Sequence, residues 1–324
     1  MTKVIRIHET GGPEVLSWDD VDIGDPGPGE ARIRQTAVGL NYIDVYHRTG
    51  LYPIGDLPQS IGTEGAGVVE AIGDGVTEVA VGDRVAYAPG LGAYAEARLI
   101  PAAKLVKVSD NVDDQTAAAM MLKGMTTSYL IRRTYPVQPG DVVLMMAAAG
   151  GVGQILSQWA KHLGATVIGC VGSEEKAELA KACGCDHTIL YNTEDVAARV
   201  KEITDGKGAA VSYDGVGQAT YYQSLDSLAP FGYMVSFGNA SGPVPTVEVA
   251  DLASRGCLFF TRPSLMPHTA TRPQLEDLAG ALMDVVGSGA VKISVEQTYA
   301  LADTQQAHRD LEARKTTGST VLLP

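Results

Sequence analysis

The chain has few cysteines, few aromatic residues and fewer basic than acidic side chains. Its 324 residues include 4 cysteines, 6% aromatic residues, 25 lysines and arginines, and 38 aspartates and glutamates. The formal net charge of −13 argues against a nucleic-acid or anionic-membrane binder, because both kinds of surface attract positive charge. We therefore expect neither nucleic acid nor a membrane as a partner.

The cysteines are too sparse and wrongly spaced for a disulfide framework or a zinc site. Cys183 and Cys185 are two positions apart, Cys170 and Cys257 stand alone, and no pair has the C-x2-C spacing. The first residues, MTKVIRIHETGG, hold no apolar run of the kind found in signal peptides. These features predict a cytoplasmic protein without a bound metal.

One uncharged run, residues 142–160, is long enough to be compared with a membrane span. Gly150, Gly151 and Gly153 lie in its middle, where a spanning helix would not normally carry a glycine turn. A buried strand, a tight turn and a helix explain the run better.

The pattern of the chain changes near Thr116. The first 125 residues or so contain short apolar segments punctuated by turns, which predicts a compact β-rich, barrel-like domain. Beyond them, apolar strands alternate with helical patterns, which predicts an α/β fold with a doubly wound parallel sheet of the Rossmann type. The expected strands are 142–147, 166–171, 187–190, 209–213, 232–237 and 258–261, and the expected helices are 151–163, 174–182, 193–204, 219–228 and 275–288.

The glycine turn after the first of these strands has the spacing of a dinucleotide-binding motif. Ala148, Gly150 and Gly153 stand at the positions of G-x-G-x-x-G, with alanine in the first place. Glycine at 150 lets the backbone approach a pyrophosphate, and glycine at 153 lets the helix pack closely on the strand. We therefore expect a dinucleotide cofactor here, although a glycine turn can also be purely structural.

The end of the second strand bears on the choice between NADP and NAD. An NAD-selective site carries an acidic residue about 20 positions after the glycines, whereas this chain has Ser173 there. A small Ser173 leaves room for a 2′-phosphate, and Lys176 supplies positive charge, so the sequence favours NADP. Ser173 is also a good helix N-cap, and Glu174 or Glu175 could instead contact a ribose 2′-hydroxyl. Tyr191 ends the third strand, where it could stack on an adenine or simply pack.

Residues 62–76 resemble the medium-chain dehydrogenase/reductase superfamily. Its zinc alcohol dehydrogenases carry G-H-E-x2-G-x5-G-x2-V at this point, and the positions that match are Gly62, Glu64, Gly67, Gly73 and Val76. The metal-ligand histidine is replaced by Thr63, and the ligand cysteine falls at Asn41. Zinc needs about four N, S or O ligands, so this departure makes a metal site improbable.

Residues 140–161 resemble the zinc-independent quinone oxidoreductase branch, which includes zeta-crystallin. The fixed positions of that pattern are matched by Gly140, Asp141, Leu144, Ala148, Ala149, Gly150, Gly151, Gly153, Gln158 and Lys161. Segments such as 41–53, 122–135, 234–244 and 316–324 look like bacterial NADPH:quinone reductases. The resemblance implies a GroES-like substrate domain of residues 1–125 and 265–324 around a cofactor domain of residues 126–264.

The resemblance also implies roles for individual residues. Asn41 and Tyr46 would stand beside the nicotinamide and the substrate as catalytic residues, and Tyr52 and Thr63 would contact the substrate. The cofactor, NADPH, would be held by Asn41, Tyr46, Thr127, Gly150, Gly151, Val152, Gly172, Ser173, Lys176, Tyr191, Phe237, Asn239 and Arg262.

The implied activity is direct hydride transfer from NADPH to a quinone without metal or flavin. Hydrogen-bond donors such as the Asn41 amide and the Tyr46 hydroxyl would stabilise negative charge on the acceptor oxygen. An enone or alkenal double-bond reductase uses the same chemistry on the same fold, and fold does not decide substrate. A non-catalytic NADPH-binding regulatory or RNA-binding protein is the alternative of a different class. The apolar segment Gly256–Thr261 predicts an exposed sheet edge through which two chains form a homodimer.

Overall fold

The computed structural model describes residues 1–244 and 246–324. They form two compact units, which we describe separately. Unit 1 comprises residues 1–125, 268–287 and 293–324, and unit 2 comprises residues 126–267 and 288–292. The chain passes from unit 1 into unit 2 around α2 (Asp114–Tyr129).

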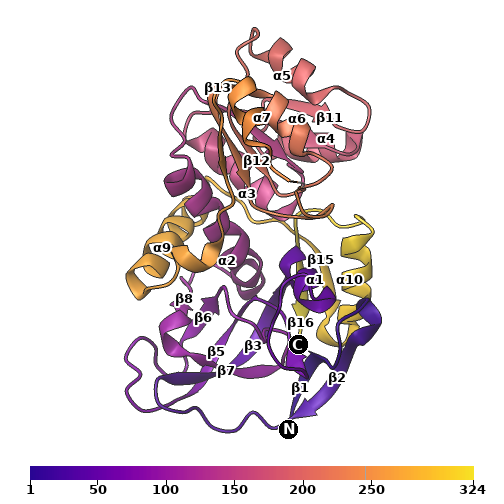
Figure 1. The fold of residues 1–324 in the computed structure, drawn as a ribbon. Helices are drawn as coiled ribbons and strands as arrows, with labels where there is room; N and C mark the ends of the chain where they lie inside the picture. The colour runs from indigo at the N-terminus through magenta and orange to yellow at the C-terminus, as the bar shows by residue number, and fades with distance from the viewer. Residues whose placement is uncertain (245) are drawn as a thin grey trace. The chain divides into compact units, whose positions relative to one another are not determined.

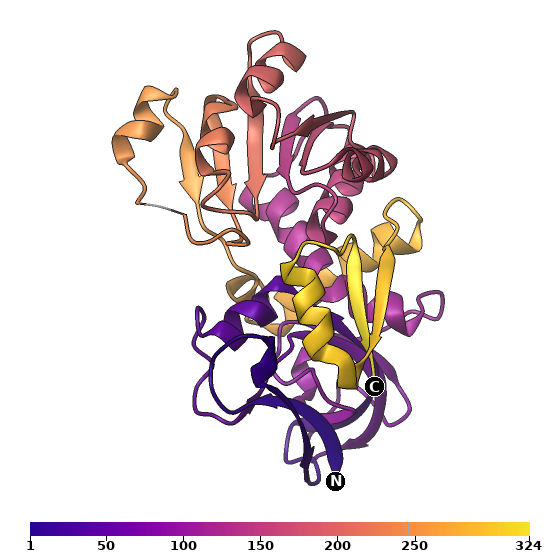
Figure 2. The same cartoon turned by 90° about the vertical axis from the view of Figure 1, so that its right-hand side faces the viewer.

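Unit 2 is built on a six-stranded sheet in the order β11-β10-β9-β12-β13-β14, in which all neighbours are parallel. Its strands are β9 (Val142–Met146), β10 (Thr166–Val171), β11 (His187–Leu190), β12 (Ala209–Asp214), β13 (Leu228–Ser236) and β14 (Phe259–Thr261). Figure 2 shows them side by side. The runs VVLMM and TVIGCV are almost wholly buried, as expected where helices cover both faces of a parallel sheet. The expected doubly wound α/β fold is therefore confirmed.

Within the described residues, five helices of unit 2 connect these strands, and a sixth, α8, follows β14. They are α3 (Gly151–His162), α4 (Glu174–Ala182), α5 (Val196–Ile203), α6 (Tyr221–Asp226), α7 (Val249–Ser254) and α8 (Leu265–His268), the last of which ends at the unit boundary. Helix α3 turns Ile155, Leu156 and Trp159 inward, which fixes it on the sheet. Ser173 and Asp195 cap α4 and α5 by accepting the N–H groups of Lys176 and Ala198.

Unit 1 contains a seven-stranded sheet and a three-stranded sheet (Figure 1). The larger sheet has the order β15-β16-β3-β5-β6-β8, with β7 also paired to β3, and the smaller has the order β2-β1-β4. The bounds are β1 (Thr2–Ile7), β2 (Leu16–Val21), β3 (Glu30–Leu40), β4 (Gln59–Ser60), β5 (Glu64–Ile72), β6 (Arg84–Tyr87), β7 (Ala97–Pro101), β8 (Val106–Lys107), β15 (Val295–Ala300) and β16 (Ser319–Leu323). This arrangement confirms the expected β-rich domain.

Three further helices belong to unit 1, namely α1 (Tyr42–Thr49), α9 (Arg272–Gly287) and α10 (Thr304–Glu312). Short turns occur at η1 (Pro13–Val15), η2 (Ala102–Lys104) and η4 (Leu301–Asp303), and α2 continues into a π-helical turn, η3 (Leu130–Thr134). Leu301, Ala307 and Leu322 join the same core cluster as Ile33 of β3, so the C-terminal segment completes the core of unit 1.

Several boundaries differ from the expected ones. Helices α5 and α6 are shorter than the expected 193–204 and 219–228, because Asp195 caps α5 only at Val196 and Thr220 precedes α6. Residues 265–267 and 288–292 belong to unit 2 rather than to the N-terminal domain. For residues 288–292 the Gln158 side chain of α3 supplies a reason, since it donates to the Lys292 carbonyl and accepts from the Lys292 N–H.

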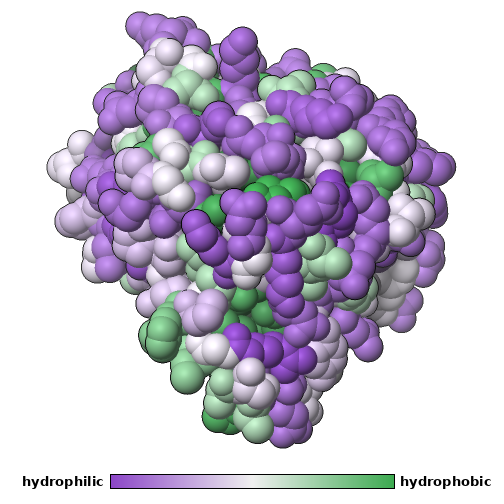
Figure 3. All heavy atoms as spheres, turned by 90° about the horizontal axis from the view of Figure 1, so that it is seen from above, coloured by the Kyte–Doolittle hydropathy of each residue, from purple (hydrophilic) through white to green (hydrophobic). Residues whose placement is uncertain are grey.

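On the face that Figure 3 shows, hydrophilic residues predominate, and hydrophobic residues gather near the middle and toward the lower end of the view. Among residues 1–244 and 246–324, no helix combines the length and apolar character needed to cross a membrane. The four cysteines are all free thiols.

Candidate active site

The expected cofactor residues of unit 2 gather at the carboxyl edge of its parallel sheet. Almost all of them directly follow a strand: Gly150, Gly151 and Val152 after β9, Gly172, Ser173 and Lys176 after β10, Tyr191 after β11, Phe237 and Asn239 after β13, and Arg262 after β14. Thr127 lies fully buried in α2. The strand order reverses between β9 and β12, and doubly wound sheets bind ligands at the carboxyl ends of strands at such a point.

The turn between β9 and α3 brings backbone close to any ligand at this edge. A Cβ at Gly153 would lie 2.5 Å from the Ala147 carbonyl oxygen, so only glycine lets α3 start this close to the strand. Ala147 itself has a left-handed backbone with φ 58°, a feature that the sequence did not reveal. Gly150 is the N-cap, and the first N–H groups of α3 have no carbonyl partner within the helix. Backbone N–H groups at the start of a helix are of the kind that bind phosphate.

The adenosine end of the expected site is assembled around Gly172. A Cβ at Gly172 would stand 2.8 Å from the Tyr191 hydroxyl oxygen, which shows that the phenol lies against this glycine. Asn192 Nδ2 donates to the Gly172 carbonyl at 3.0 Å and helps to hold the two loops together. Ser173 caps α4 through its side-chain oxygen, and Lys176 stands in the first turn. The structure thus brings Gly172, Ser173 and Tyr191 together.

On the other side of the switch point, Phe237 packs against the end of β12. A Cβ at Gly215 would be 2.9 Å from the Phe237 ring, and the Phe237 N–H donates to the Asp214 carbonyl at 2.8 Å. Asp214 is fully buried and accepts hydrogen bonds from two backbone N–H groups and from the hydroxyls of Thr220 and Ser224. This carboxylate therefore stabilises the loop beside Phe237.

In unit 1, Asn41 joins the end of β3 to the start of α1. Its backbone N–H donates to Asp44 Oδ2 at 2.8 Å, and the Asp44 N–H donates back to the Asn41 carbonyl at 3.0 Å. Asp44 thus caps the helix from its first turn, where a negative charge is favoured. The side-chain amide of Asn41 is 5% exposed and points to a second carboxylate, with Nδ2 2.7 Å from Glu64 Oε1.

Glu64 is fully buried at the start of β5 and lies opposite Gly39 of β3. Besides the Asn41 amide, Glu64 Oε1 accepts from Lys123 Nζ at 2.7 Å, and Oε2 accepts from the Leu122 N–H at 2.6 Å. A Cβ at Gly39 would lie 2.5 Å from Glu64 Cγ, so the glycine makes room for the carboxylate.

Asp44 is the centre of the neighbouring network. Thr63 Oγ1 donates to Asp44 Oδ1 at 2.9 Å, and the Tyr94 hydroxyl donates to Oδ2 at 2.9 Å. Burial raises the pKa of Asp44 to about 7, although these hydrogen bonds and the one from Asn41 oppose the rise. The nearby Glu64 charge also raises the pKa of Asp44.

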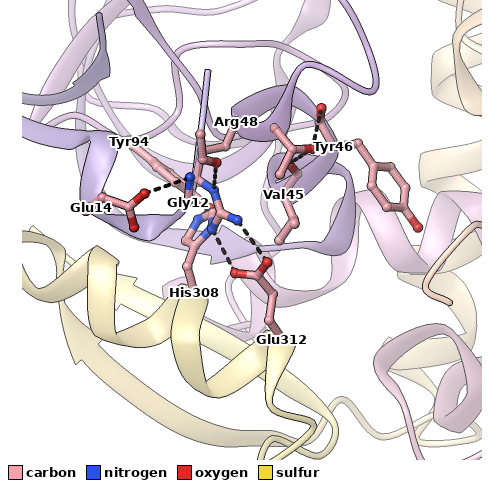
Figure 4. Close-up of polar contacts among 10 residues, drawn as sticks. Gly12, Glu14, Val45, Tyr46, Arg48, Tyr94, His308 and Glu312 are labelled. Carbon is pink, nitrogen blue, oxygen red and sulfur yellow. Dashed lines mark hydrogen bonds and ion pairs between the residues drawn. The ribbon is translucent and has the colours of Figure 1, made fainter. Parts of the chain in front are cut away.

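The network continues to Arg48 and Glu312 (Figure 4). Arg48 Nη1 donates to His308 Nδ1 at 3.0 Å, so the hydrogen of His308 is on Nε2 and is donated to the Tyr94 oxygen at 3.1 Å. Arg48 also binds both carboxylate oxygens of Glu312, at 2.9 and 2.8 Å. Burial, together with the nearby Arg48 charge, lowers the pKa of His308 to about 3. Because Arg48 donates to Nδ1, the His308 Nε2–H is donated to the Tyr94 oxygen, which directs the Tyr94 hydroxyl toward Asp44.

Tyr46 belongs to a different group, on the side of α1 away from Arg48 (Figure 4). Its ring centroid lies 5.0 Å from that of Tyr52 and 5.8 Å from that of Tyr42. The structure therefore pairs Tyr46 with Tyr52, and joins Asn41 to Thr63 through Asp44.

The residues at the zinc-ligand positions do not form a zinc donor set. Asn41 offers an N–H to Glu64, and the Thr63 hydroxyl is donated to Asp44. Throughout residues 1–244 and 246–324, no group of three or more His, Cys, Asp or Glu side chains is placed to hold a metal ion.

Sequence reasoning missed the polar residues that hold Asn41 and Thr63 in place. Asp44 follows Asn41 by three positions, and Glu64 lies inside the matched G-x-E segment, so both had a local signal. Lys123, Tyr94 and His308 had none, because their partners are far away in the sequence.

The sheet order, the glycine turn and the loops at the switch point define a dinucleotide-binding α/β protein of the Rossmann type. Two family models match the chain, "Alcohol dehydrogenase GroES-like domain" over residues 27–110 and "Zinc-binding dehydrogenase" over residues 151–290. The chain belongs to the zinc-independent quinone oxidoreductase branch of the medium-chain dehydrogenase/reductase superfamily.

Full-length relatives establish this membership. The chain is 51% identical to a quinone oxidoreductase of Pseudomonas aeruginosa and 48% identical to a 2-haloacrylate reductase of a Burkholderia species, with 99–100% of each chain covered. The solved structure of Escherichia coli quinone oxidoreductase complexed with NADPH is 45% identical, covers 99% of this chain and 100% of its own, and gives a TM-score of 0.97. The expected family is therefore confirmed.

Proposed function

We propose that this quinone oxidoreductase transfers a hydride from NADPH to a quinone with the help of Asn41 and Tyr46. NADPH is the cofactor and a quinone is the substrate. The observation that carries this function is full-length similarity, at 45–51% identity, to proteins named quinone oxidoreductase. When bound, NADPH supplies the hydride. The protein needs only to bind and orient the cofactor and the quinone and to stabilise the charge that develops on the quinone oxygen.

The carboxyl edge of unit 2 fits this cofactor. The first-turn N–H groups of α3 would bind the pyrophosphate, a role supported by Gly153, where a side chain would block the close approach of α3 to the strand. We propose that Ser173 and Lys176 bind the 2′-phosphate and that Tyr191 stacks on the adenine. Gly172, Phe237, Asn239, Arg262 and Thr127 would hold the rest of the molecule.

Asn41 and Tyr46 would act on the acceptor. An amide nitrogen carries two hydrogens, and Asn41 Nδ2 donates one of them to Glu64. We propose that the second is donated to the quinone oxygen on which negative charge develops. The Tyr46 hydroxyl would donate a second hydrogen bond and pass on the proton, while Tyr52 and Thr63 would position the ring.

Double-bond reduction is the less favoured activity. One relative of 48% identity is named 2-haloacrylate reductase, but quinone oxidoreductases stand at 51%, 46% and 45% identity. An analysis of the products from a quinone and from an aliphatic enone separates the two reactions.

Steady-state kinetics of Asn41→Ala and Tyr46→Phe test the site. Loss of one donor to a developing oxyanion costs about 10²–10³ in kcat, and we expect a fall of this order for Asn41→Ala. The exposed Asn111 and Tyr222 supply the controls Asn111→Ala and Tyr222→Phe. If both site variants turn over a para-quinone as fast as their controls, the proposed roles are wrong.

We further propose that the chain is a cytoplasmic homodimer. Strand β14 is the edge strand of the unit 2 sheet, as expected, and its Phe259 is 50% exposed. An exposed apolar edge favours pairing with another strand. The location is tested by cell fractionation and the assembly by the variant described below.

A further inference from the structure

Lys123 and Glu64 form a buried ion pair directly behind the Asn41 amide. Lys123 is 8% and Glu64 0% exposed at the side chain, and Nζ lies 2.7 Å from Oε1. The same oxygen accepts the Asn41 Nδ2 hydrogen at 2.7 Å. Buried ion pairs seldom add net stability, because desolvation of the two charges offsets their attraction. Stability therefore gives little reason for this pair, whereas its contact with Asn41 suggests a functional one.

The charge balance around Asn41 depends on Lys123. Asn41 is bonded to two buried carboxylates, Asp44 through its backbone N–H and Glu64 through its side chain. Among the described residues, the hydroxyls of Tyr87 and Tyr94 also lie within reach of the Glu64 charge, and burial raises the pKa of both tyrosines, which keeps them neutral. Lys123 contacts Glu64 directly and compensates its charge.

We propose that Lys123 is a positioning residue for hydride transfer, which neutralises Glu64 so that the carboxylate can orient the Asn41 amide without repelling the negative charge that develops on the acceptor oxygen. This inference rests on the proposed role of Asn41. The Glu64 carboxylate fixes which way the amide faces, because only the nitrogen end can donate to it. This arrangement also brings the negative charge of Glu64 close to the quinone oxygen, because only the Asn41 side chain would lie between them. The quinone oxygen itself becomes negative during hydride transfer.

An uncompensated Glu64 would have one of two effects. As an anion in a poorly screened interior it would destabilise the transition state by repulsion. If it instead took up a proton, that repulsion would vanish. Removal of the Lys123 charge should therefore make hydride transfer sensitive to pH in a way that the wild-type protein is not.

The test compares wild-type protein with Lys123→Met, Glu64→Gln/Lys123→Met and the exposed-lysine control Lys104→Met. We expect Lys123→Met to lower kcat for a para-quinone by about tenfold to a hundredfold under alkaline conditions. The uncompensated Glu64 charge would oppose the negative charge on the acceptor oxygen, and the expected loss is comparable to or smaller than that from removal of one oxyanion donor. Its kcat should rise toward the wild-type value as the pH falls and Glu64 is protonated. The double variant should recover about tenfold over Lys123→Met at alkaline pH, because the single side-chain oxygen of glutamine still accepts from Asn41 and carries no charge. Only the bond from the Leu122 N–H is lost. KM for NADPH should stay nearly unchanged, because the residues of unit 2 that are proposed to hold the pyrophosphate, the adenine and the 2′-phosphate are not altered.

Two results would overturn the inference. One is a pH profile of kcat for Lys123→Met that runs parallel to that of wild type. Asp44 is present in both proteins, so a difference between the two profiles would come from Glu64, which has lost its cation in the variant. The other is a double variant as slow as Lys123→Met. Should Lys123→Met not fold, a double variant about a hundredfold or more slower than wild type overturns the inference, because that is the loss expected when a donor to the oxyanion is removed altogether. Asn41→Ala separates this failure from that of the proposed function. If Asn41→Ala is fast, the role of Asn41 is wrong; if it is slow while the Lys123 profiles are unaltered, only the role of Lys123 is wrong.

Discussion

Burial shifts the pKa values of two side chains of unit 1 in opposite directions. The pKa of Asp44 rises to about 7 and that of His308 falls to about 3, and in both cases burial disfavours the charged form. The same desolvation thus makes Asp44 easier to protonate and His308 harder to protonate. Their effects on stability consequently have opposite signs with respect to pH.

The pH dependence of stability separates the two groups. Between about pH 4 and 7 the folded state holds a proton on Asp44 that the unfolded chain has released, so this group stabilises the fold at low pH and loses its contribution as the pH rises. His308 acts the other way, favouring the fold as the pH rises from about 3 toward its ordinary pKa of 6.5. We expect the difference in unfolding free energy between wild type and Asp44→Asn to shrink with rising pH across the first window. Urea unfolding at several pH values measures it, and a constant difference would contradict the assigned shift.

Lys176 is the residue by which the choice between NADPH and NADH can be tested. An ammonium near a 2′-phosphate contributes a charge-assisted hydrogen bond, and loss of such a contact costs about tenfold or more in affinity. We expect Lys176→Ala to raise KM for NADPH about tenfold and to leave KM for NADH nearly unaltered. Lys181→Ala on the same helix, where Lys181 pairs with Glu178 on the exposed surface, is the matched control. An equal change for both cofactors would place Lys176 outside the phosphate site.

At the scale of elements, the turn from β9 to α3 is the most constrained connection of unit 2. A Cβ at Gly153 would lie 2.5 Å from the Ala147 oxygen and 2.6 Å from the Ala148 oxygen, both of them backbone atoms with little freedom to shift. We expect Gly153→Ala to lower the unfolding free energy by about 1–3 kcal/mol, the usual cost of overpacking, and to weaken NADPH binding measured by fluorescence titration.

Gly280 in α9 supplies the control for this variant. A Cβ there would meet nothing within 4 Å, and alanine is the better helix former by about 1 kcal/mol. Gly280→Ala should therefore be neutral or stabilising with NADPH affinity intact. A Gly153→Ala protein that matches Gly280→Ala in both measurements would show that α3 can withdraw from the strand.

The elements of unit 2 could be predicted well from the sequence, because buried parallel strands read as short continuous apolar runs. β10 and α4 have the expected bounds, since Val171 ends the run and Ser173 caps the helix. The bounds of β13 could not be predicted, because its first residues extend through Pro230 and Phe231, which are exposed and carry no strand pattern. Helix α1 escaped notice because Tyr42–Thr49 is short and polar.

Residues of the site could be predicted only where they belong to a short sequence pattern. The glycine turn and Ser173 follow from spacing within one βα unit, whereas the bonds from Lys123 to Glu64 and from Tyr94 to His308 span 59 and 214 positions. Such pairs arise from the topology of unit 1, which single-sequence periodicity does not encode.

At the scale of the whole molecule, the proposed homodimer depends on the edge strand β14. Phe259 stacks on Tyr233 and is half exposed, and a lysine at an edge position is a common barrier to strand pairing. We expect wild-type protein to be dimeric and Phe259→Lys to be monomeric at micromolar concentration by light scattering. A monomeric wild type, or a dimeric Phe259→Lys, would contradict pairing through this edge.

Rapid mixing of the purified protein with NADPH and one acceptor at a time tests the central claim most directly. The acceptors are an ortho-quinone, a para-quinone and an aliphatic enone, and both NADPH loss and reduced product are followed. We predict rapid loss of NADPH with the quinones, one hydroquinone formed per NADPH consumed, and a much slower reaction in Asn41→Ala. Rapid turnover of the enone alone, or bound NADPH that no quinone oxidises, would contradict the account.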